Sequence, residues 1–147
     1  MAVYTKINKG DISFINKQFG IEEIISFQGI KKGIENTNYL LKSKNKKFIL
    51  TIFEKRVSNK EIPFFMKLMD QLNYSKINCP KPLKSNNGSY LIKLKNKTAC
   101  IVSFIQGKDK NKLSSKNCFE VGKIIAEIHH ITKNIKISDF FILLNSF

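Results

Sequence analysis

The sequence lacks most of the features that mark secreted, membrane-spanning or metal-cluster proteins. Its 147 residues include only three cysteines, and none of them has Cys-x-x-Cys spacing. We interpret these cysteines as reduced structural thiols, and we predict no metal ligands. No apolar run approaches the roughly 20 residues that a transmembrane helix needs. The first residues also lack the apolar stretch of a signal peptide. We therefore expect a cytoplasmic protein that does not interact with membranes.

Arginine is nearly absent, although the chain is strongly basic. The formal net charge is +15, from 26 Lys and Arg against 11 Asp and Glu, and Arg56 is the only arginine. Specific nucleic-acid readers rely on bidentate arginine contacts. The composition therefore favours a solvated, lysine-rich surface, with nucleic-acid binding as the weaker alternative. A basic surface also attracts an anionic nucleotide.

The apolar pattern predicts an α+β fold. With 42% apolar residues, the chain has the composition of a folded domain rather than of a disordered one. Asp11 is a candidate N-cap for a helix whose apolar face includes Ile12, Ile15 and Phe19, and Gly20 would end that helix. The further segments expected are strands over 24–30, 38–43, 47–53, 82–84, 90–94 and 98–105, and helices over 62–72 and 114–131.

These segments predict two units joined by a short linker. Residues 1–107 form a small lobe with an antiparallel sheet and a helix against it. Residues 108–113 are a charged linker, and residues 114–147 begin a second, mostly helical unit. The apolar stripe of helix 114–131 needs a covering partner. We therefore expect the 147-residue chain to expose an apolar patch.

One polar loop has the composition of a phosphate-binding segment. Gly33 permits a close approach of the backbone to a ligand. Asn36, Thr37 and Asn38 follow it and offer side-chain donors, and a buried strand, residues 47–53, then returns beside the loop. The alternative interpretation is an Asn-rich hairpin turn that binds no ligand.

The order and spacing of several segments resemble a known family. The chain is similar to the bacterial homoserine kinase branch of the aminoglycoside phosphotransferase and choline kinase-like fold, which is related to the protein kinases. The resemblance extends over essentially all 147 residues. It is carried by residues 1–5, 26–30, 33–39, 48–56 and 63–65, together with Leu68, Met69 and Leu72.

The resemblance implies a kinase-like N-terminal lobe followed by the first helix of a truncated C-terminal lobe. It further implies transfer of the ATP γ-phosphoryl group to the hydroxyl of L-homoserine, with Mg²⁺, in threonine biosynthesis. ATP and L-homoserine would be the ligands of the full-length enzyme. Choline or an aminoglycoside stays an alternative acceptor, and the resemblance leaves the oligomeric state open.

The resemblance also assigns nucleotide-binding residues. Thr51 holds the strand position where the wider kinase fold has a phosphate-binding lysine. Lys55 or Arg56 is a candidate for that missing cation, although a solvated role is favoured for both. The complete predicted set comprises the loop, this strand position and the hinge between lobes: Gly33, Asn36, Thr37, Asn38, Thr51, Ser103, Phe104 and Ile105.

The catalytic residues of such a kinase are absent from this sequence. The His-x-Asp pattern, with a later Asn and Asp for Mg²⁺, does not occur after residue 107, where Asp109 and Asp139 are the only aspartates. His129 and His130 are interpreted as helix-end histidines that favour the helix dipole. We therefore predict no catalytic residue and no metal ligand, and a chain that is inactive by itself. A noncatalytic nucleotide-binding or partner-docking module is the alternative.

Overall fold

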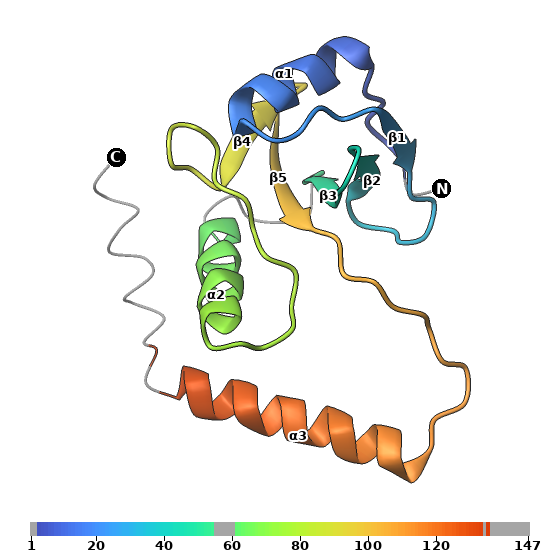
Figure 1. Cartoon of the computed structure of the whole chain (residues 1–147), viewed down its shortest axis with the longest axis vertical. Coiled ribbons are helices and arrows are strands. Elements are labelled where there is room, and N and C mark those ends of the chain that lie inside the picture. Colours follow the sequence, from blue (N-terminus) through green and yellow to red (C-terminus); the bar gives the residue numbers. More distant parts are fainter. Residues whose placement is uncertain (1–2, 55–60, 134, 136–147) are drawn as a thin grey trace.

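The computed structural model contains one five-stranded antiparallel sheet with helices on both sides (Figure 1). The structure describes residues 3–54, 61–133 and 135. The strand order is β1-β2-β3-β5-β4. The elements, in chain order, are α1 (Lys9–Phe19), β1 (Ser26–Gly29), β2 (Thr37–Lys42), β3 (Lys47–Ile52), α2 (Ile62–Tyr74), β4 (Leu91–Leu94), β5 (Lys97–Ser103) and α3 (Ser115–Thr132). The predicted α+β class is confirmed.

The main core lies between α1 and one face of the sheet. Successive side chains of a strand point to opposite faces, so alternate residues of β2, β3 and β5 reach this core. Leu41, Leu50 and Ile101 have no exposed surface. Ile15 of α1 is also fully buried and packs in the same cluster. This face therefore supplies most of the hydrophobic stabilisation of the lobe.

The N-terminus of α1 differs from the sequence prediction. Asn8, not Asp11, is the N-cap, and its side chain accepts a hydrogen bond from the Asp11 N–H at 3.0 Å. Asp11 sits at the third helical position, where its carboxylate accepts the Asn8 N–H at 2.8 Å. The pair forms a capping box, which satisfies backbone donors at both positions. Gly20 ends the helix with φ 54°, as predicted.

The second face of the sheet is covered by α2 only over β4 and β5. Ile62 and Met66 of α2 pack against Cys100 of β5. Burial raises the pKa of the Cys100 thiol to about 12, so this thiol is protonated and unreactive at neutral pH. Over β2 and β3 the same face carries half-buried side chains, and no helix packs against them within the described residues. We call this region the open face; it carries Asn38 and Leu40 of β2 and Ile49 and Thr51 of β3.

The predicted strand over 82–84 is reduced to a single bridge between Pro82 and Val102. Proline has no N–H to donate, so it cannot extend a ladder. Leu83 and Ser103 add one backbone hydrogen bond each, to Ile101 and Lys81 respectively, and these bonds hold the segment beside β5. The other strands lie within two or three residues of their predicted bounds.

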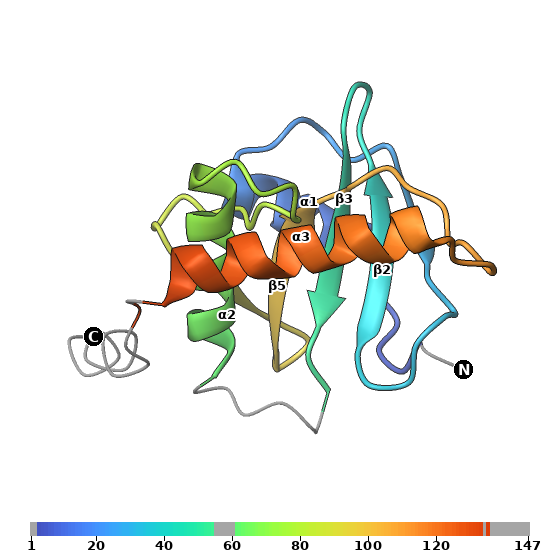
Figure 2. The same cartoon turned by 90° about the horizontal axis from the view of Figure 1, so that it is seen from below.

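Helix α3 runs beneath the sheet, across its strands (Figure 2). It begins after Ser114, whose side chain accepts the Asn117 N–H, as the sequence predicts. None of its side chains is buried, and Phe119 is 70% exposed. The expected exposed apolar patch is therefore present on α3. The assignment of residues 108–113 and 114–147 to a linker and a second lobe stays a prediction.

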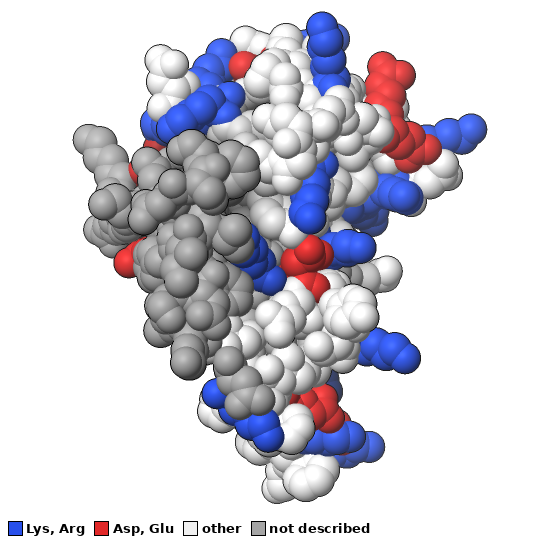
Figure 3. All heavy atoms as spheres, turned by 90° about the vertical axis from the view of Figure 1, so that its left-hand side faces the viewer, with Lys and Arg blue, Asp and Glu red and all other residues white. Residues whose placement is uncertain are grey.

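The surface charge is dispersed on the side of the molecule that Figure 3 shows. Figure 3 shows Lys and Arg side chains scattered over one side of the molecule, with acidic side chains between them. Such a distribution resembles a solvated surface more than a continuous polyanion track. Across the parts of the chain with described structure, no helix has the length and apolar character needed to cross a membrane.

Candidate nucleotide site

The phosphate loop was predicted to begin at Gly33 and to include Asn36, Thr37 and Asn38. In the structure, residues 30–36 connect β1 to β2 at one end of the open face, and we call them the loop. Gly33 has φ +112°, a conformation that other residues rarely adopt. A Cβ atom at this position would meet nothing within 4 Å. The glycine is therefore required by the backbone turn, and the space beside it is free for a ligand.

The open face carries an apolar platform next to this loop. Leu40 of β2 and Ile49 of β3 are register partners, and each is half-buried. Asn38 and Thr51 are the next pair on the same face, and the Thr51 hydroxyl donates to Asn38 Oδ1 at 2.8 Å. The sequence prediction missed Leu40 and Ile49. Leu40 lies two residues from Asn38 in β2, and Ile49 lies two residues from Thr51 in β3. Because side chains alternate along a strand, this spacing places all four on one face and could have identified the two apolar residues.

Unused amide donors lie between the loop and the platform. The Asn38 carboxamide oxygen takes the Thr51 hydroxyl, and the Asn36 carboxamide oxygen takes the Glu54 N–H at 3.3 Å. Neither carboxamide NH₂ group makes a hydrogen bond within the ranges that the structure describes. Free N–H donors beside a glycine turn suit the oxygens of a phosphate group.

Thr37 is placed differently from its neighbours. Its side chain has no exposed surface and points to the α1 side of the sheet. The hydroxyl bonds with the N-terminal segment and with Glu54. The structure therefore does not bring the Thr37 side chain together with Asn38 and Thr51.

The predicted hinge follows β5, and its three residues have different surroundings. Ser103 Oγ accepts the Lys81 N–H at 2.8 Å, on the side of the sheet away from the platform. The Phe104 N–H donates to the Lys47 carbonyl at 3.1 Å, and the Lys47 ammonium lies 5.7 Å from the Phe104 ring centroid. Because Lys47, Ile49 and Thr51 alternate on one face, Phe104 lies at the far end of the platform from the loop.

Ile105 offers the backbone groups that the hinge prediction requires. Within the described ranges, its N–H and C=O make no hydrogen bond. The platform therefore lies between the loop at one end and Phe104, which precedes this peptide unit, at the other. An elongated ligand with an anionic end and a planar apolar end would match that arrangement.

The cation predicted to compensate for Thr51 is not located. Lys55 and Arg56 lie outside the described residues, as does Asp139. In the loop itself, Lys32 pairs with Asp109 of the linker. This hydrogen bond, followed by the charge of Asp109, raises the pKa of the Lys32 ammonium. Both side chains are exposed, so solvent screens the interaction.

The two histidines take the helix-end positions that the sequence predicts, and Asp70 is paired with Tyr90. His129 and His130 lie exposed in the last turn of α3. Asp70 stands away from the apolar face of α2, and its carboxylate accepts the Tyr90 hydroxyl at 2.5 Å. Burial, together with this hydrogen bond, raises the pKa of Tyr90 to about 12.

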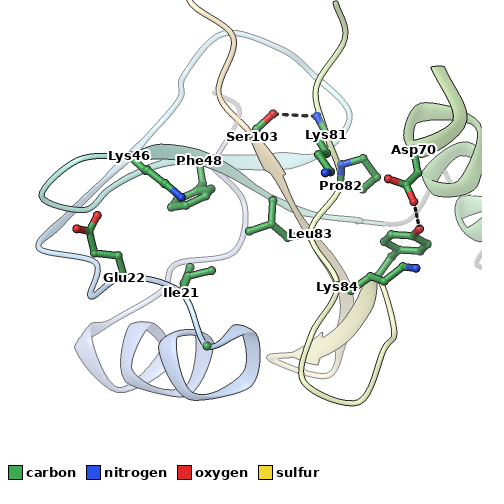
Figure 4. Close-up of a pocket in the computed structure, with 12 residues that line it drawn as sticks. Ile21, Glu22, Lys46, Phe48, Asp70, Lys81, Pro82, Leu83, Lys84 and Ser103 are labelled. Atoms are coloured by element: carbon green, nitrogen blue, oxygen red, sulfur yellow. Dashed lines mark hydrogen bonds between the residues drawn. The ribbon is translucent and has the colours of Figure 1, made fainter. Parts of the chain in front are cut away.

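A hollow of about 670 Å³ lies elsewhere on the lobe, around Ile21, Phe48 and Leu83 (Figure 4). Among the predicted site residues only Ser103 lines it. Glu22 and Asp70 also line it, and both carboxylates already accept hydrogen bonds from neighbouring residues. Three lysines, Lys46, Lys81 and Lys84, line the hollow beside these two carboxylates, and no residue of the predicted phosphate loop lines it. It is therefore a separate feature from the open face.

Comparison with known proteins identifies the family. Residues 26–141 match the phosphotransferase enzyme family, APH. The chain belongs to this family. A homoserine kinase from Rhizobium etli is 38% identical over 129 residues, which cover 88% of this chain and 40% of that protein. A homoserine kinase from Bartonella henselae is 36% identical over 138 residues, covering 94% and 43%. The chain thus spans about two fifths of the length of these relatives.

The phosphotransferase fold is also found in solved structures. Spectinomycin phosphotransferase APH(9)-Ia in complex with ADP and spectinomycin superposes with a TM-score of 0.70 at 18% identity, covering 91% of this chain and 40% of that one. Its AMP-bound complex gives a TM-score of 0.67 at 20% identity. The predicted resemblance and the kinase-like lobe are both confirmed. The roles of the individual site residues stay predictions.

Proposed function

We propose that this chain is the nucleotide-binding lobe of an ATP-dependent homoserine kinase. In this proposal residues 1–107 bind ATP, residues 108–113 are the hinge linker, and residues 114–147 begin the second lobe. The enzyme phosphorylates the hydroxyl of L-homoserine in threonine biosynthesis. The observation that carries the proposal is the open face, where an apolar platform lies between a glycine loop and Phe104, which precedes a free peptide unit. Identities of 36–38% to homoserine kinases support the choice of acceptor.

The residues present fit a nucleotide. Leu40 and Ile49 offer a flat apolar surface for the adenine ring, and Ile105 offers backbone groups for its edge. Gly33, with the free amides of Asn36 and Asn38, would surround the phosphates. Thr51 orients Asn38 through their hydrogen bond. ATP supplies the phosphoryl group that is transferred.

The described residues do not fit Mg²⁺. No group of three or more His, Cys, Asp or Glu side chains in this part of the chain is placed to hold a metal ion. Its ligands are expected in the second lobe of the full-length enzyme, together with the base for the acceptor hydroxyl. The 147-residue chain should therefore bind ATP without turning it over.

Matched variants test the nucleotide site. Ile49→Glu places a carboxylate on the platform, where it would repel the phosphates and disrupt ring contact. Ile25→Glu makes the same change at a residue that is 68% exposed and off the open face. Isothermal titration with ATP should show at least a tenfold weaker Kd for Ile49→Glu alone. Equal Kd values for both variants and the parent chain would reject the open face as the site.

The acceptor needs a separate assay. The full-length kinase should consume ATP with L-homoserine, and choline and an aminoglycoside serve as competing acceptors. A preference for either competitor would keep the phosphotransferase assignment and replace the substrate.

A further inference from the structure

The N-terminal residues Val3–Thr5, which we call the strap, contact the last residue of β1, the candidate phosphate loop and the first residue of β2. At its start, Val3 lies so close to Gly29 that a Cβ there would be 2.8 Å from Val3 Cγ2. In its middle, the Tyr4 hydroxyl donates to the Ile34 carbonyl at 3.0 Å. At its end, the strap bonds with Thr37. The strap, about 30 residues away in sequence, is thereby joined to both ends of the loop and to Ile34 within it.

The contact at Thr37 saturates a buried hydroxyl. Thr37 Oγ1 accepts the N–H groups of Tyr4 and Thr5 at 2.9 and 3.1 Å. It donates its only hydrogen to Glu54 Oε1 at 2.7 Å. A hydroxyl has one donor and two acceptor sites, so Thr37 has no side-chain capacity left for a phosphate oxygen.

A charged group fixes the other side of this contact. The Thr5 hydroxyl donates to Glu54 Oε1 at 2.7 Å, and the Lys97 ammonium bonds with both Thr5 and Glu54. The Glu54 side chain is 10% exposed. Tyr39 adds a further bond, because its hydroxyl donates to the Thr5 carbonyl at 3.0 Å. Since the strap is held by β2, the end of β3 and β5, it is part of the rigid lobe.

We propose that the strap holds the phosphate loop in its nucleotide-binding position, and that Tyr4 and Thr37 are positioning residues. Neither side chain touches the nucleotide. Tyr4 holds the middle of the loop through the Ile34 carbonyl, and Thr37 holds its end through the two strap amides. A loop that is already ordered loses less conformational entropy when ATP binds. The proposal rests on the proposed function only for its effect on ATP, because the ordering of the loop exists without a ligand.

Tyr4→Phe tests the middle contact with a minimal change. The Tyr4 side chain is 56% exposed, so loss of the hydroxyl leaves the core intact. Tyr74→Phe is the matched control, since Tyr74 is 90% exposed and has no hydrogen bond through its hydroxyl in the described part of the chain. Backbone ¹⁵N order parameters should fall at Gly33 and Ile34 only in Tyr4→Phe. The Kd for ATP should rise about threefold, with the melting temperature unchanged.

Thr37 provides the second test, with a built-in rescue. Thr37→Val removes the hydroxyl and should expose the Tyr4 and Thr5 amides to hydrogen exchange at least tenfold faster, about the loss of one or two buried bonds. Thr37→Ser keeps the hydroxyl and should restore slow exchange and the parent Kd. If Thr37→Val does not fold, the Tyr4 pair still decides the question.

The outcomes separate the strap from the proposed function. Unchanged order parameters in Tyr4→Phe would overturn the strap. A looser loop with an unchanged Kd would overturn the positioning role. If the parent chain does not bind ATP, the proposed function fails and the positioning role fails with it, whereas the relaxation and exchange results still decide whether the strap orders the loop.

Discussion

The two faces of the sheet are built from the same strands and yet have opposite properties. On the α1 side, Leu41 and Leu50 have no exposed surface. On the other side, their neighbours Leu40 and Ile49 stay half-buried, because no helix packs against them in the described residues. Because successive side chains of a strand point to opposite faces, one residue contributes to the core and the next one is available for binding. Adjacent residues of one strand should respond to substitution in different ways.

The largest expected effect on stability is on the α1 side of the sheet, which we call the closed face. Leu50→Ala leaves a cavity in a fully buried position, and the free energy of unfolding should fall by about 2–5 kcal/mol. Urea denaturation followed by circular dichroism measures this loss. A loss below about 1 kcal/mol would show that the α1 face is not the main core.

Glu54→Gln should weaken the attachment of the strap to the closed face by about 1–2 kcal/mol at pH 7. Burial raises the pKa of the Glu54 carboxyl, but bonds from Lys97, Thr37 and Thr5, with the charge of Lys97, outweigh it, and the pKa is lowered from 4.5. A lowered folded-state pKa stabilises the protein above the unfolded value, and this contribution disappears as pH falls through the folded pKa.

The pH dependence of stability follows from the lowered pKa of Glu54. The parent chain should lose this part of its stability on acidification below about pH 4.5, and Glu54→Gln should lack that part of the loss. Thermal melts between pH 3 and pH 7 measure both curves. Parallel curves would contradict an ionised Glu54 in the folded state.

Ile49→Ala should reverse the pattern of Leu50→Ala. The side chain lies on the open face, so its truncation should change stability little while weakening ATP binding about fivefold, by loss of apolar contact. Isothermal titration and a urea melt on the same sample give both numbers. Loss of stability without loss of affinity would indicate that this residue belongs to the core.

The smallest effect is expected at the loop surface. Lys32→Ala removes the exposed pair with Asp109, and no measurable change in stability should follow. Any decrease in ATP affinity should vanish as salt is raised from 0.05 to about 0.5 M, because screening removes interactions between exposed charges. A decrease that persists at high salt would contradict a purely screened, long-range role for Lys32.

Local sequence pattern was sufficient to predict most of the elements. The spacing of Ile12, Ile15 and Phe19 defines α1, and the apolar run from Phe48 to Ile52 defines the central strand. The predicted ends of elements were wrong where capping hydrogen bonds or a proline set the end. Asn8 is a better N-cap than Asp11 because Asp11 completes the capping box from the third position. Pro82 limits its segment to one bridge.

The site was only partly accessible to sequence reasoning. Gly33, Asn38 and Thr51 were identified from composition and family resemblance. Asn38 and Thr51 are hydrogen-bonded on the open face, and Gly33 lies in the loop that leads into β2. Thr37 has the same polar character, but its place is set by contacts with residues 32 and 33 positions away, which leave no periodic signal. Leu40 and Ile49 were missed because a partly exposed apolar residue resembles a core residue in sequence.

The most direct measurement is a ¹⁵N NMR titration of the 147-residue chain with ATP. Binding at the open face should shift amide resonances from the loop, along the platform, to the hinge, with the largest changes at Gly33, Asn38, Ile49, Thr51 and Ile105. Amides of the closed face, such as Leu50, should move little. Shifts confined to the separate hollow around Ile21, Phe48 and Leu83, or no saturable shifts, would contradict nucleotide binding at this face.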